Sequence, residues 1–331
     1  MSVFSNMPKV EMIKLSDGRD LAFSIFGDPT GYPVFYCHGS PGSRLEGLVY
    51  QEKAAEYGLK LIVPDRPGFG KSSFYSGRKL LDFPDDNAEL AKHLSAEEYG
   101  IIGHSGGGPY SLISRYADPE HVKFSISIGG YTNFGQMSDA ADFLQTKADR
   151  LAVSLSQSHP KLFRLFFELL SVAIKYVPKS YMRALVKASG AADREIIETQ
   201  AFRSLLIEDQ KEALVQGGHG AALDCVILYE DWGACLEDFP DRIVLFQGTE
   251  DRLVPVEFAR HLAANISGSE LVVLEEQGHL FPWQQQDLIF QTARDQIGSL
   301  DERIEPVAAP ICPIQPRINE GEQDVLIHKT N

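Results

Sequence analysis

A serine in a glycine-rich turn is the residue of this chain best placed to do chemistry. Ser105 lies within Gly103-His104-Ser105-Gly106-Gly107, which follows the apolar run 99–102 and precedes an expected helix over residues 109–116. Glycines two positions before and after the serine permit a strand-to-helix turn too tight for side chains. Such a turn holds the hydroxyl above the sheet edge, and the helix N-terminus directs backbone N–H dipoles toward a developing oxyanion. We therefore predict that Ser105 is a nucleophile.

A serine hydroxyl needs a histidine base, and that histidine needs a carboxylate to orient it. His279 follows the apolar run 271–274, so we expect it on a loop at the carboxyl edge of the sheet, where ligands bind. The expected carboxylate is Asp251, in the turn that follows strand 243–247. Its neighbour Glu250 remains an alternative. The chain order serine, aspartate, histidine is the order expected when the serine occupies this kind of turn.

Two backbone N–H groups are expected to stabilise the oxyanion. Gly106 follows the nucleophile and supplies the first. The second should come from the loop after strand 33–37, which begins His38-Gly39-Ser40-Pro41. Ser40 is the expected donor because Pro41 has no N–H, and its hydroxyl is not required.

The elements that must position these residues form an alternating pattern over the first 130 residues. Residues 10–15 and 21–26 predict a hairpin that turns at Asp17-Gly18. Compact apolar runs then alternate with helical patterns, which is typical of a doubly wound, mostly parallel sheet. The expected strands are 33–37, 59–63, 99–102 and 122–128, and the expected helices are 44–57, 87–94 and 109–116.

Helical patterns without strands then continue to about residue 232, and they predict a helical lid inserted into an α/β fold. The boundaries we expect are 1–131 for the first part of the core, 132–235 for the lid and 236–300 for the second part of the core. Residues 301–331 contain several prolines and no periodicity, so we expect a disordered tail. The expected lid helices are 140–155, 162–177, 181–188 and 195–216, followed by strands 243–247 and 271–274 and helices 256–264 and 287–297.

Composition narrows the class of protein. The chain has 331 residues with 44% hydrophobic content, which is enough for a large core, and its net charge of −15 argues against a nucleic-acid partner. The amino terminus lacks the pattern of a signal peptide, and no apolar stretch is long enough to span a membrane. Four cysteines without metal-like spacing favour a reducing, cytoplasmic setting. Neither a cofactor nor a metal is expected, and the oligomeric state is left open.

The order of these motifs resembles the α/β-hydrolase superfamily. The resemblance rests on His38–Gly42, Asp65-Arg66-Pro67-Gly68-Phe69-Gly70-Lys71-Ser72, Gly103–Gly107, Asp251 and Gly278-His279, and it covers about residues 9 to 300. Lid-bearing members similar to prolyl iminopeptidases or esterases are the closest likeness. Haloalkane dehalogenases and epoxide hydrolases of the superfamily carry aspartate where this chain has Ser105, so the resemblance implies acyl chemistry instead.

The resulting expectation is a serine hydrolase acting on a small or medium acyl compound, with a carboxylic ester as the first choice. An aminopeptidase or a thioesterase would use the same triad, an acyltransferase or perhydrolase would use another acceptor, and a weakly catalytic binding protein is the remaining alternative. Phe163, Phe166 and Phe167 could wall an apolar acyl pocket, or could simply pack the lid. An aminopeptidase would instead need carboxylates for the substrate ammonium, for which the candidates are Glu195, Glu198 and Glu208.

Overall fold

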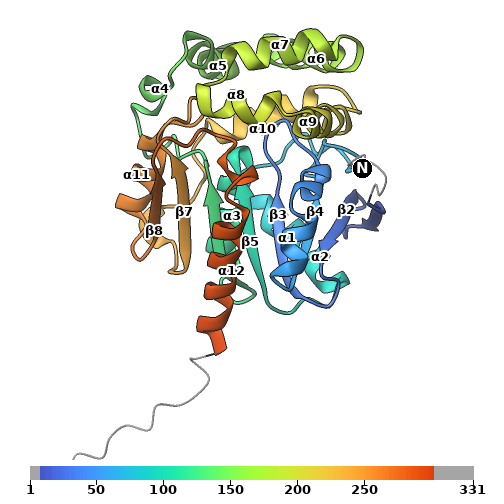
Figure 1. Ribbon diagram of the computed structural model, residues 1–331, viewed down its shortest axis with the longest axis vertical. Coiled ribbons are helices and arrows are strands. Elements are labelled where there is room, and N and C mark those ends of the chain that lie inside the picture. The colour runs from blue at the N-terminus through green and yellow to red at the C-terminus, as the bar shows by residue number, and fades with distance from the viewer. Residues whose placement is uncertain (1–7, 302–331) are drawn as a thin grey trace, which may run out of the picture.

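The computed structural model describes residues 8–301, and within them a single sheet of eight strands forms the centre of the molecule (Figure 1). The strand order is β1-β2-β4-β3-β5-β6-β7-β8. The strands are β1 (Glu11–Lys14), β2 (Asp20–Gly27), β3 (Tyr32–Cys37), β4 (Leu59–Pro64), β5 (Tyr99–His104), β6 (Val122–Ile128), β7 (Ile243–Gly248) and β8 (Glu270–Leu274).

The sheet is parallel except at one edge. β2 pairs antiparallel with both β1 and β4, and the remaining neighbours pair parallel. β5 and β7 are almost entirely buried, as expected for apolar runs covered on both faces. The predicted hairpin and the predicted mostly parallel sheet are therefore confirmed.

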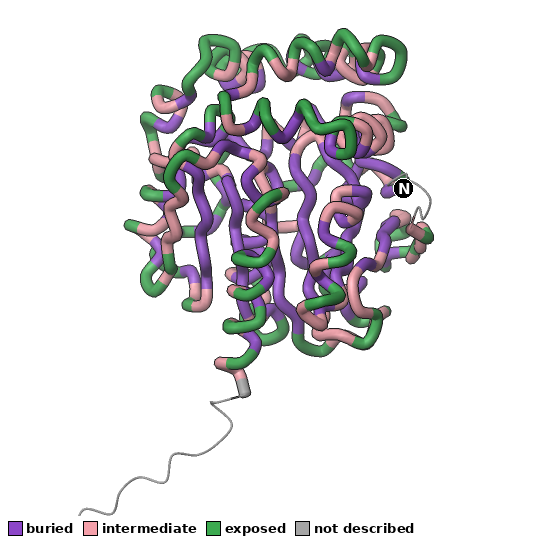
Figure 2. The backbone as a smooth tube through the Cα atoms, viewed as in Figure 1, coloured by how far each residue is buried: buried purple, intermediate pink, exposed green. Residues whose placement is uncertain are grey.

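Helices cover both faces of the sheet and bury two hydrophobic layers. On one face α2 (Phe83–His93), α3 (Gly108–Ala117) and α11 (Val256–Asn265) pack through residues such as Leu90, Leu112 and Leu262. On the other, α1 (Gln51–Glu56) and α12 (Gln286–Asp301) pack through residues such as Ala54 and Phe290. Figure 2 shows the strands as the buried centre between these layers.

Seven α-helices lie between β6 and β7 among the described residues, and we call the segment that they span the helical insertion (residues 140–228). Figure 1 shows two tiers, with α8–α10 next to the sheet edge and α5–α7 outermost. Whether the insertion acts as a lid stays a prediction. Its helices are α4 (Ala140–Phe143), α5 (Lys147–Ser158), α6 (Pro160–Tyr176), α7 (Pro178–Ala188), α8 (Ala191–Glu198), α9 (Gln200–Ala213) and α10 (His219–Leu228).

Three of the helices that the sequence predicted as continuous are divided in the structure. The pattern over 140–155 becomes two helices, because the Thr146 side chain accepts a hydrogen bond from the N–H of Asp149 and starts α5. The pattern over 195–216 is interrupted where Thr199 takes an extended conformation between α8 and α9. Residues 44–57 begin as a 3₁₀ helix (Arg44–Val49) before α1, and α10 had not been predicted as a helix.

The predicted disordered tail lies outside the described residues, apart from Asp301 at the end of α12. Within residues 8–301, every helix is too short or too polar to cross a bilayer.

Candidate active site

Ser105 occupies the turn between β5 and α3, as predicted, and its backbone is strained. Its φ of 55° lies in the left-handed region that non-glycine residues seldom adopt. The flanking glycines are required by close contacts: a Cβ on Gly103 would lie 2.1 Å from the carbonyl oxygen of Gly107. A Cβ on Gly107 would lie 2.0 Å from the carbonyl oxygen of Cys37. The chain can therefore make this turn only with glycine at both positions.

His279 and Asp251 are brought together at the carboxyl ends of β8 and β7. The His279 Nδ1 atom is 2.7 Å from Asp251 Oδ2, and both side chains are buried. Asp251 also accepts hydrogen bonds from the N–H groups of Leu253 and Val254 and from the Gln247 amide. Its carboxylate is therefore fixed in position. Glu250, the alternative, uses its backbone N–H to hold the carbonyl of Gln277 instead.

The electrostatics of this pair raise the pKa of His279. Burial by itself lowers the pKa of His279, but the charge of Asp251 and its hydrogen bond outweigh burial, and the pKa lies above its ordinary value. His104, next to Ser105, has the opposite character: burial and the neighbouring His279 lower its pKa to about 3. Its Nε2 atom is 3.2 Å from the carbonyl oxygen of His279, which places the two loops side by side.

The loop after β3 lies against the turn that carries Ser105. A Cβ on Gly39 would be 3.6 Å from Ser105 Cβ, and a Cβ on Gly106 would be 2.8 Å from Ser40 Oγ. Ser40 and Gly106, the two predicted oxyanion donors, are therefore neighbours. Their role as donors stays a prediction.

A buried charge cluster fixes this loop, and sequence analysis had not found it. The Arg66 guanidinium donates to the carbonyls of His38 and Gly39 and to Ser40 Oγ. It also pairs with Asp224 on α10, at 2.8 Å. The hydroxyl of Ser40 donates to the same carboxylate. The hydroxyl that we expected to be dispensable is thus part of the support of the loop.

Asp224 is the centre of the cluster and remains ionised. Arg78 pairs with it at 2.7 Å, and the hydroxyl of Tyr110 donates to it at 2.6 Å. Burial by itself would raise the pKa of Asp224, but the charges of Arg66 and Arg78 hold it below its usual range. The pairing of opposite charges explains how these ions persist where an isolated ion would not, although Arg78 Nε is buried without a hydrogen-bond partner among the described residues.

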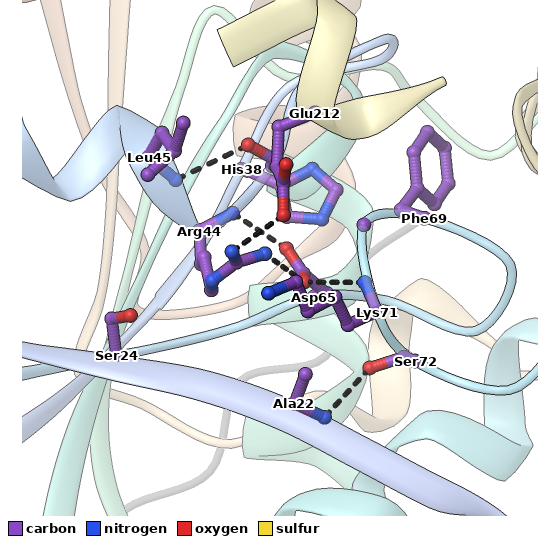
Figure 3. Close-up of polar contacts among 12 residues, drawn as sticks. Ala22, Ser24, His38, Arg44, Leu45, Asp65, Phe69, Lys71, Ser72 and Glu212 are labelled. Carbon is purple, nitrogen blue, oxygen red and sulfur yellow. Dashed lines mark hydrogen bonds and ion pairs between the residues drawn. The ribbon is translucent and has the colours of Figure 1, made fainter. Parts of the chain in front are cut away.

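The Asp65–Ser72 motif forms a second polar anchor beneath the insertion (Figure 3). Asp65 accepts hydrogen bonds from the backbone N–H groups of Arg44 and Lys71 and pairs with the Arg44 guanidinium at 2.6 Å. Arg44 in turn pairs with Glu212 of α9 at 2.5 Å. The motif therefore joins the loops of the core to the inner tier of the insertion.

With this geometry in view, comparison with known proteins identifies the family. A family model described as the alpha/beta hydrolase family matches residues 34–292, a span that contains Ser105, Asp251 and His279. The chain belongs to the alpha/beta hydrolase family. The superfamily resemblance read from the sequence is confirmed, and so is the fold.

Proteins similar to this family member are described as hydrolases of more than one kind. "Uncharacterized hydrolase YcgS" of Bacillus subtilis is 26% identical over 281 residues, covering 82% of this chain and 92% of the relative. The 2-hydroxy-6-oxononadienedioate/2-hydroxy-6-oxononatrienedioate hydrolase of Escherichia coli K12 is 25% identical over 242 residues, covering 71% and 75%. An esterase from Exiguobacterium antarcticum has the same fold, with a TM-score of 0.62 at 22% identity and coverage of 88% and 100%.

A cavity of about 70 Å³ lies beside the loops that carry Ser105 and His279 in this alpha/beta hydrolase, between α9 and the core. Glu46 and Asp209 contribute carboxylates to an otherwise mostly apolar lining that includes His104 and Leu280, the neighbours of Ser105 and His279. Burial raises the pKa of Glu46 to about 7 and raises that of Asp209 well above its usual range. The remaining lining residues are Tyr36, Val49, Tyr50, Phe202, Leu205, Leu206, Pro282 and Trp283.

The predicted acyl-pocket phenylalanines of α6 take two different positions. Phe163 and Phe167 are buried in the core of the insertion, and Phe166 is 58% exposed. The cavity beside the loops of Ser105 and His279 is lined by other residues, so the substrate role of these three phenylalanines stays a prediction. Two of the candidate ammonium-binding acids, Glu195 and Glu198, are exposed, while Glu208 pairs with Lys211 at 2.8 Å.

Within the described residues, no group of three or more His, Cys, Asp or Glu side chains is arranged to hold a metal ion. The positioning residues that were not predicted from the sequence are Arg66, Asp224, Glu46 and Gln247. Glu46 belongs to this set because its carboxylate accepts a hydrogen bond from the N–H of Gly39 at 2.8 Å. Arg66 lies in the Asp65–Ser72 motif, so the sequence did mark its position. The other three carry no local pattern that marks them.

Proposed function

We propose that this protein is a serine hydrolase that cleaves a small or medium acyl compound, with a carboxylic ester as its substrate, through an acyl-enzyme. One observation carries the proposal. A histidine paired with a fixed carboxylate at 2.7 Å lies on a loop beside a serine in a strained left-handed turn. Few structural purposes require all three at the carboxyl edge of one sheet.

In the proposed reaction, Ser105 Oγ attacks the ester carbonyl while His279 Nε2 takes the serine proton. Asp251 holds Nδ1–H, which fixes the tautomer and stabilises the imidazolium. The charge that develops on the carbonyl oxygen is accepted by the backbone N–H groups of Ser40 and Gly106. His279 then gives the proton to the departing alkoxide, so that an alcohol leaves and the acyl group remains on Ser105.

Water completes the cycle. His279 takes a proton from a water molecule while the water oxygen attacks the acyl carbon. The second tetrahedral intermediate then collapses and releases the acid. His279 returns the proton to Ser105 Oγ. Each step conserves atoms and charge, and none requires a group beyond this chain and water.

A second candidate, aminopeptidase action, is favoured by one observation. Glu46 and Asp209 place two carboxyl groups in the cavity beside the proposed triad. Burial raises the pKa of both, and a bound substrate ammonium would oppose that shift and favour their charged forms. Comparison of the specificity constants for a butyryl ester and a prolyl amide separates the two. Preference for the amide by more than about tenfold, or about 1.4 kcal/mol in the barrier, would favour the aminopeptidase.

The decisive experiment combines labelling with mutation of the nucleophile. The wild-type protein should react with a fluorophosphonate probe and hydrolyse a nitrophenyl ester, and Ser105→Ala should abolish both. Triad losses in serine hydrolases reduce turnover by about a millionfold. Heat-treated protein controls for non-specific labelling, and circular dichroism checks the fold of the variant. Undiminished hydrolysis by Ser105→Ala would show that the assignment is wrong.

A further inference from the structure

The outermost helices of the insertion present an apolar face that no described element covers. On α6, the side chains of Leu162, Leu165, Phe166, Leu169, Val172 and Tyr176 are all more than half exposed. Spacings of three and four residues place them along one side of the helix. The inward side is separately filled by Phe163, Phe167 and Ile174, which are buried. The exposed apolar side is therefore additional to what the packing of the insertion requires.

Helices α6 and α7 together carry an unusual net charge. Residues 160–188 contain six cations and one carboxylate, Glu168, which gives a net charge of +5 within a chain whose net charge is −15. All six cations are exposed: Lys161, Arg164, Lys175, Lys179, Arg183 and Lys187. The Glu168 carboxylate accepts a hydrogen bond from the N–H of Gly218 at 2.8 Å and lies 3.6 Å from Arg164. On α7, Lys179, Arg183 and Lys187 follow one another at intervals of four, along one side of the helix.

These helices lie at the end of the molecule farthest from the sheet. Figure 1 shows α6 and α7 as the outer tier, with α8–α10 between them and the core. Figure 2 shows that this tier is largely exposed. Leu162, Leu165, Phe166 and Leu169 are therefore accessible from outside the molecule. Val172 and Tyr176 border a hollow that they share with Glu208, Lys211 and Glu212 of α9.

We propose that α6 and α7 form a peripheral binding surface for an anionic lipid bilayer. Apolar side chains next to lysine and arginine are the composition of helices that lie in the plane of a membrane interface. The apolar residues of α6 would enter the boundary between headgroups and acyl chains, while the cations contact anionic headgroups. α6 has 17 residues and is not long or apolar enough to cross a bilayer, which agrees with a position in the interface.

Charge favours a bilayer over a second copy of the chain. A symmetric contact between two of these faces would bring two surfaces of net charge +5 together, which is unfavourable. The cations have their complement in an anionic surface. This inference concerns binding alone, so it stands or falls independently of the proposed hydrolysis.

Co-sedimentation with lipid vesicles tests the proposal. The full chain should pellet with phosphatidylcholine vesicles that contain about 30% phosphatidylserine and stay in solution with pure phosphatidylcholine, and added salt should release it. Lys179→Gln/Arg183→Gln/Lys187→Gln should weaken the partition roughly a hundredfold, on the basis of three lost charges at the surface. Leu165→Glu/Leu169→Glu should weaken it by at least about tenfold, because its apolar contact is lost.

Control variants make changes of the same kind elsewhere on the surface. Lys71→Gln/Lys79→Gln/Lys92→Gln removes three exposed cations outside α6 and α7, and Met12→Glu adds a charge at a half-exposed apolar residue of β1. Both should partition like the wild type, and all variants should keep its thermal unfolding midpoint.

Three results would overturn the proposal. One is absence of binding to the anionic vesicles. Another is binding that does not depend on phosphatidylserine and is equally strong for the α6 and α7 variants and for the control variants. The third is a dimer, detected by light scattering, that Leu165→Glu/Leu169→Glu dissociates, because the face would then be an interface between copies.

Discussion

The Asp251 carboxylate is held in one position by its own hydrogen bonds, independently of its contact with the His279 imidazole. Two backbone N–H groups and the Gln247 amide hold its carboxylate, and the remaining direction of Oδ2 points to His279 Nδ1. In the proposed reaction, the imidazole therefore has one tautomer and one orientation available, with its Nε2 atom toward the substrate. A carboxylate with fewer partners would leave the ring free to rotate.

The raised pKa of His279 predicts the acid limb of the activity profile. The imidazole must be neutral to accept a proton from Ser105, so kcat/KM for a nitrophenyl ester should rise with pH through the pKa of His279 in the free enzyme. Because Asp251 raises that pKa, the midpoint should lie above 6.5, the ordinary value for histidine. Asp251→Asn should lower the midpoint and reduce the plateau by about 10⁴. A midpoint at or below 6.5 in the wild type would contradict the electrostatic argument.

Among the elements, the inner tier of the insertion supports the loops of the core. Asp193 of α8 accepts a hydrogen bond from the N–H of Leu280, next to His279. Asp209 of α9 accepts from the N–H and hydroxyl of Ser43. Asp224 of α10 holds Ser40 and Arg66. Helices that are far in sequence from the Ser105 turn thus determine the shape of the loops around that turn.

Asp224→Asn tests this support directly. Loss of the charge leaves Arg66 and Arg78 buried without their counter-ion, which typically costs about 3–5 kcal/mol of stability. Since Arg66 also holds the carbonyls of His38 and Gly39, the Ser40 N–H should move, and kcat should fall much more than KM rises.

Urea unfolding and steady-state ester hydrolysis measure the two effects. Glu230→Gln, an exposed carboxylate just after α10, is the matched control and should change neither. Lowered stability with an unchanged kcat would mean that Asp224 supports the fold without positioning the loop.

For the whole molecule, burial of acids beside the active site couples stability to pH. Glu46 has a pKa of about 7 in the folded protein against an ordinary value of 4.5. Between these values the folded state keeps a proton that the unfolded chain has lost, so the free energy of unfolding falls as pH rises through this window. Asp209, whose pKa is also raised by burial, contributes in the same direction.

Glu46→Gln removes one of these titrations. Its free energy of unfolding relative to the wild type should increase between about pH 4.5 and 7.5, by at most about 3 kcal/mol. Urea unfolding at several pH values measures the difference, and Glu52→Gln, an exposed glutamate on α1, should show no such trend. A constant difference across the range would show that Glu46 does not titrate in this way.

The sequence by itself determined what depends on local pattern. The glycines around Ser105 mark a turn that excludes side chains, apolar runs mark the buried strands, and Asp17-Gly18 marks a hairpin. Because parallel strands end at one edge of a sheet, the order of strands also predicted that His279 and Asp251 would meet.

Only the tertiary structure decided which distant side chains support those residues. Asp224 meets Ser40 across 184 positions of the chain, and Glu46 meets Asp209 only after α9 folds over the core. Such contacts leave no periodicity, since each is a single residue satisfied by a partner from another element. Helix breaks at Thr146 and Thr199 depend on one side-chain hydrogen bond or one backbone angle, which hydrophobic spacing does not record. Local sequence patterns therefore locate the candidate site residues, and buried charge pairs from distant elements fix the loops that carry them.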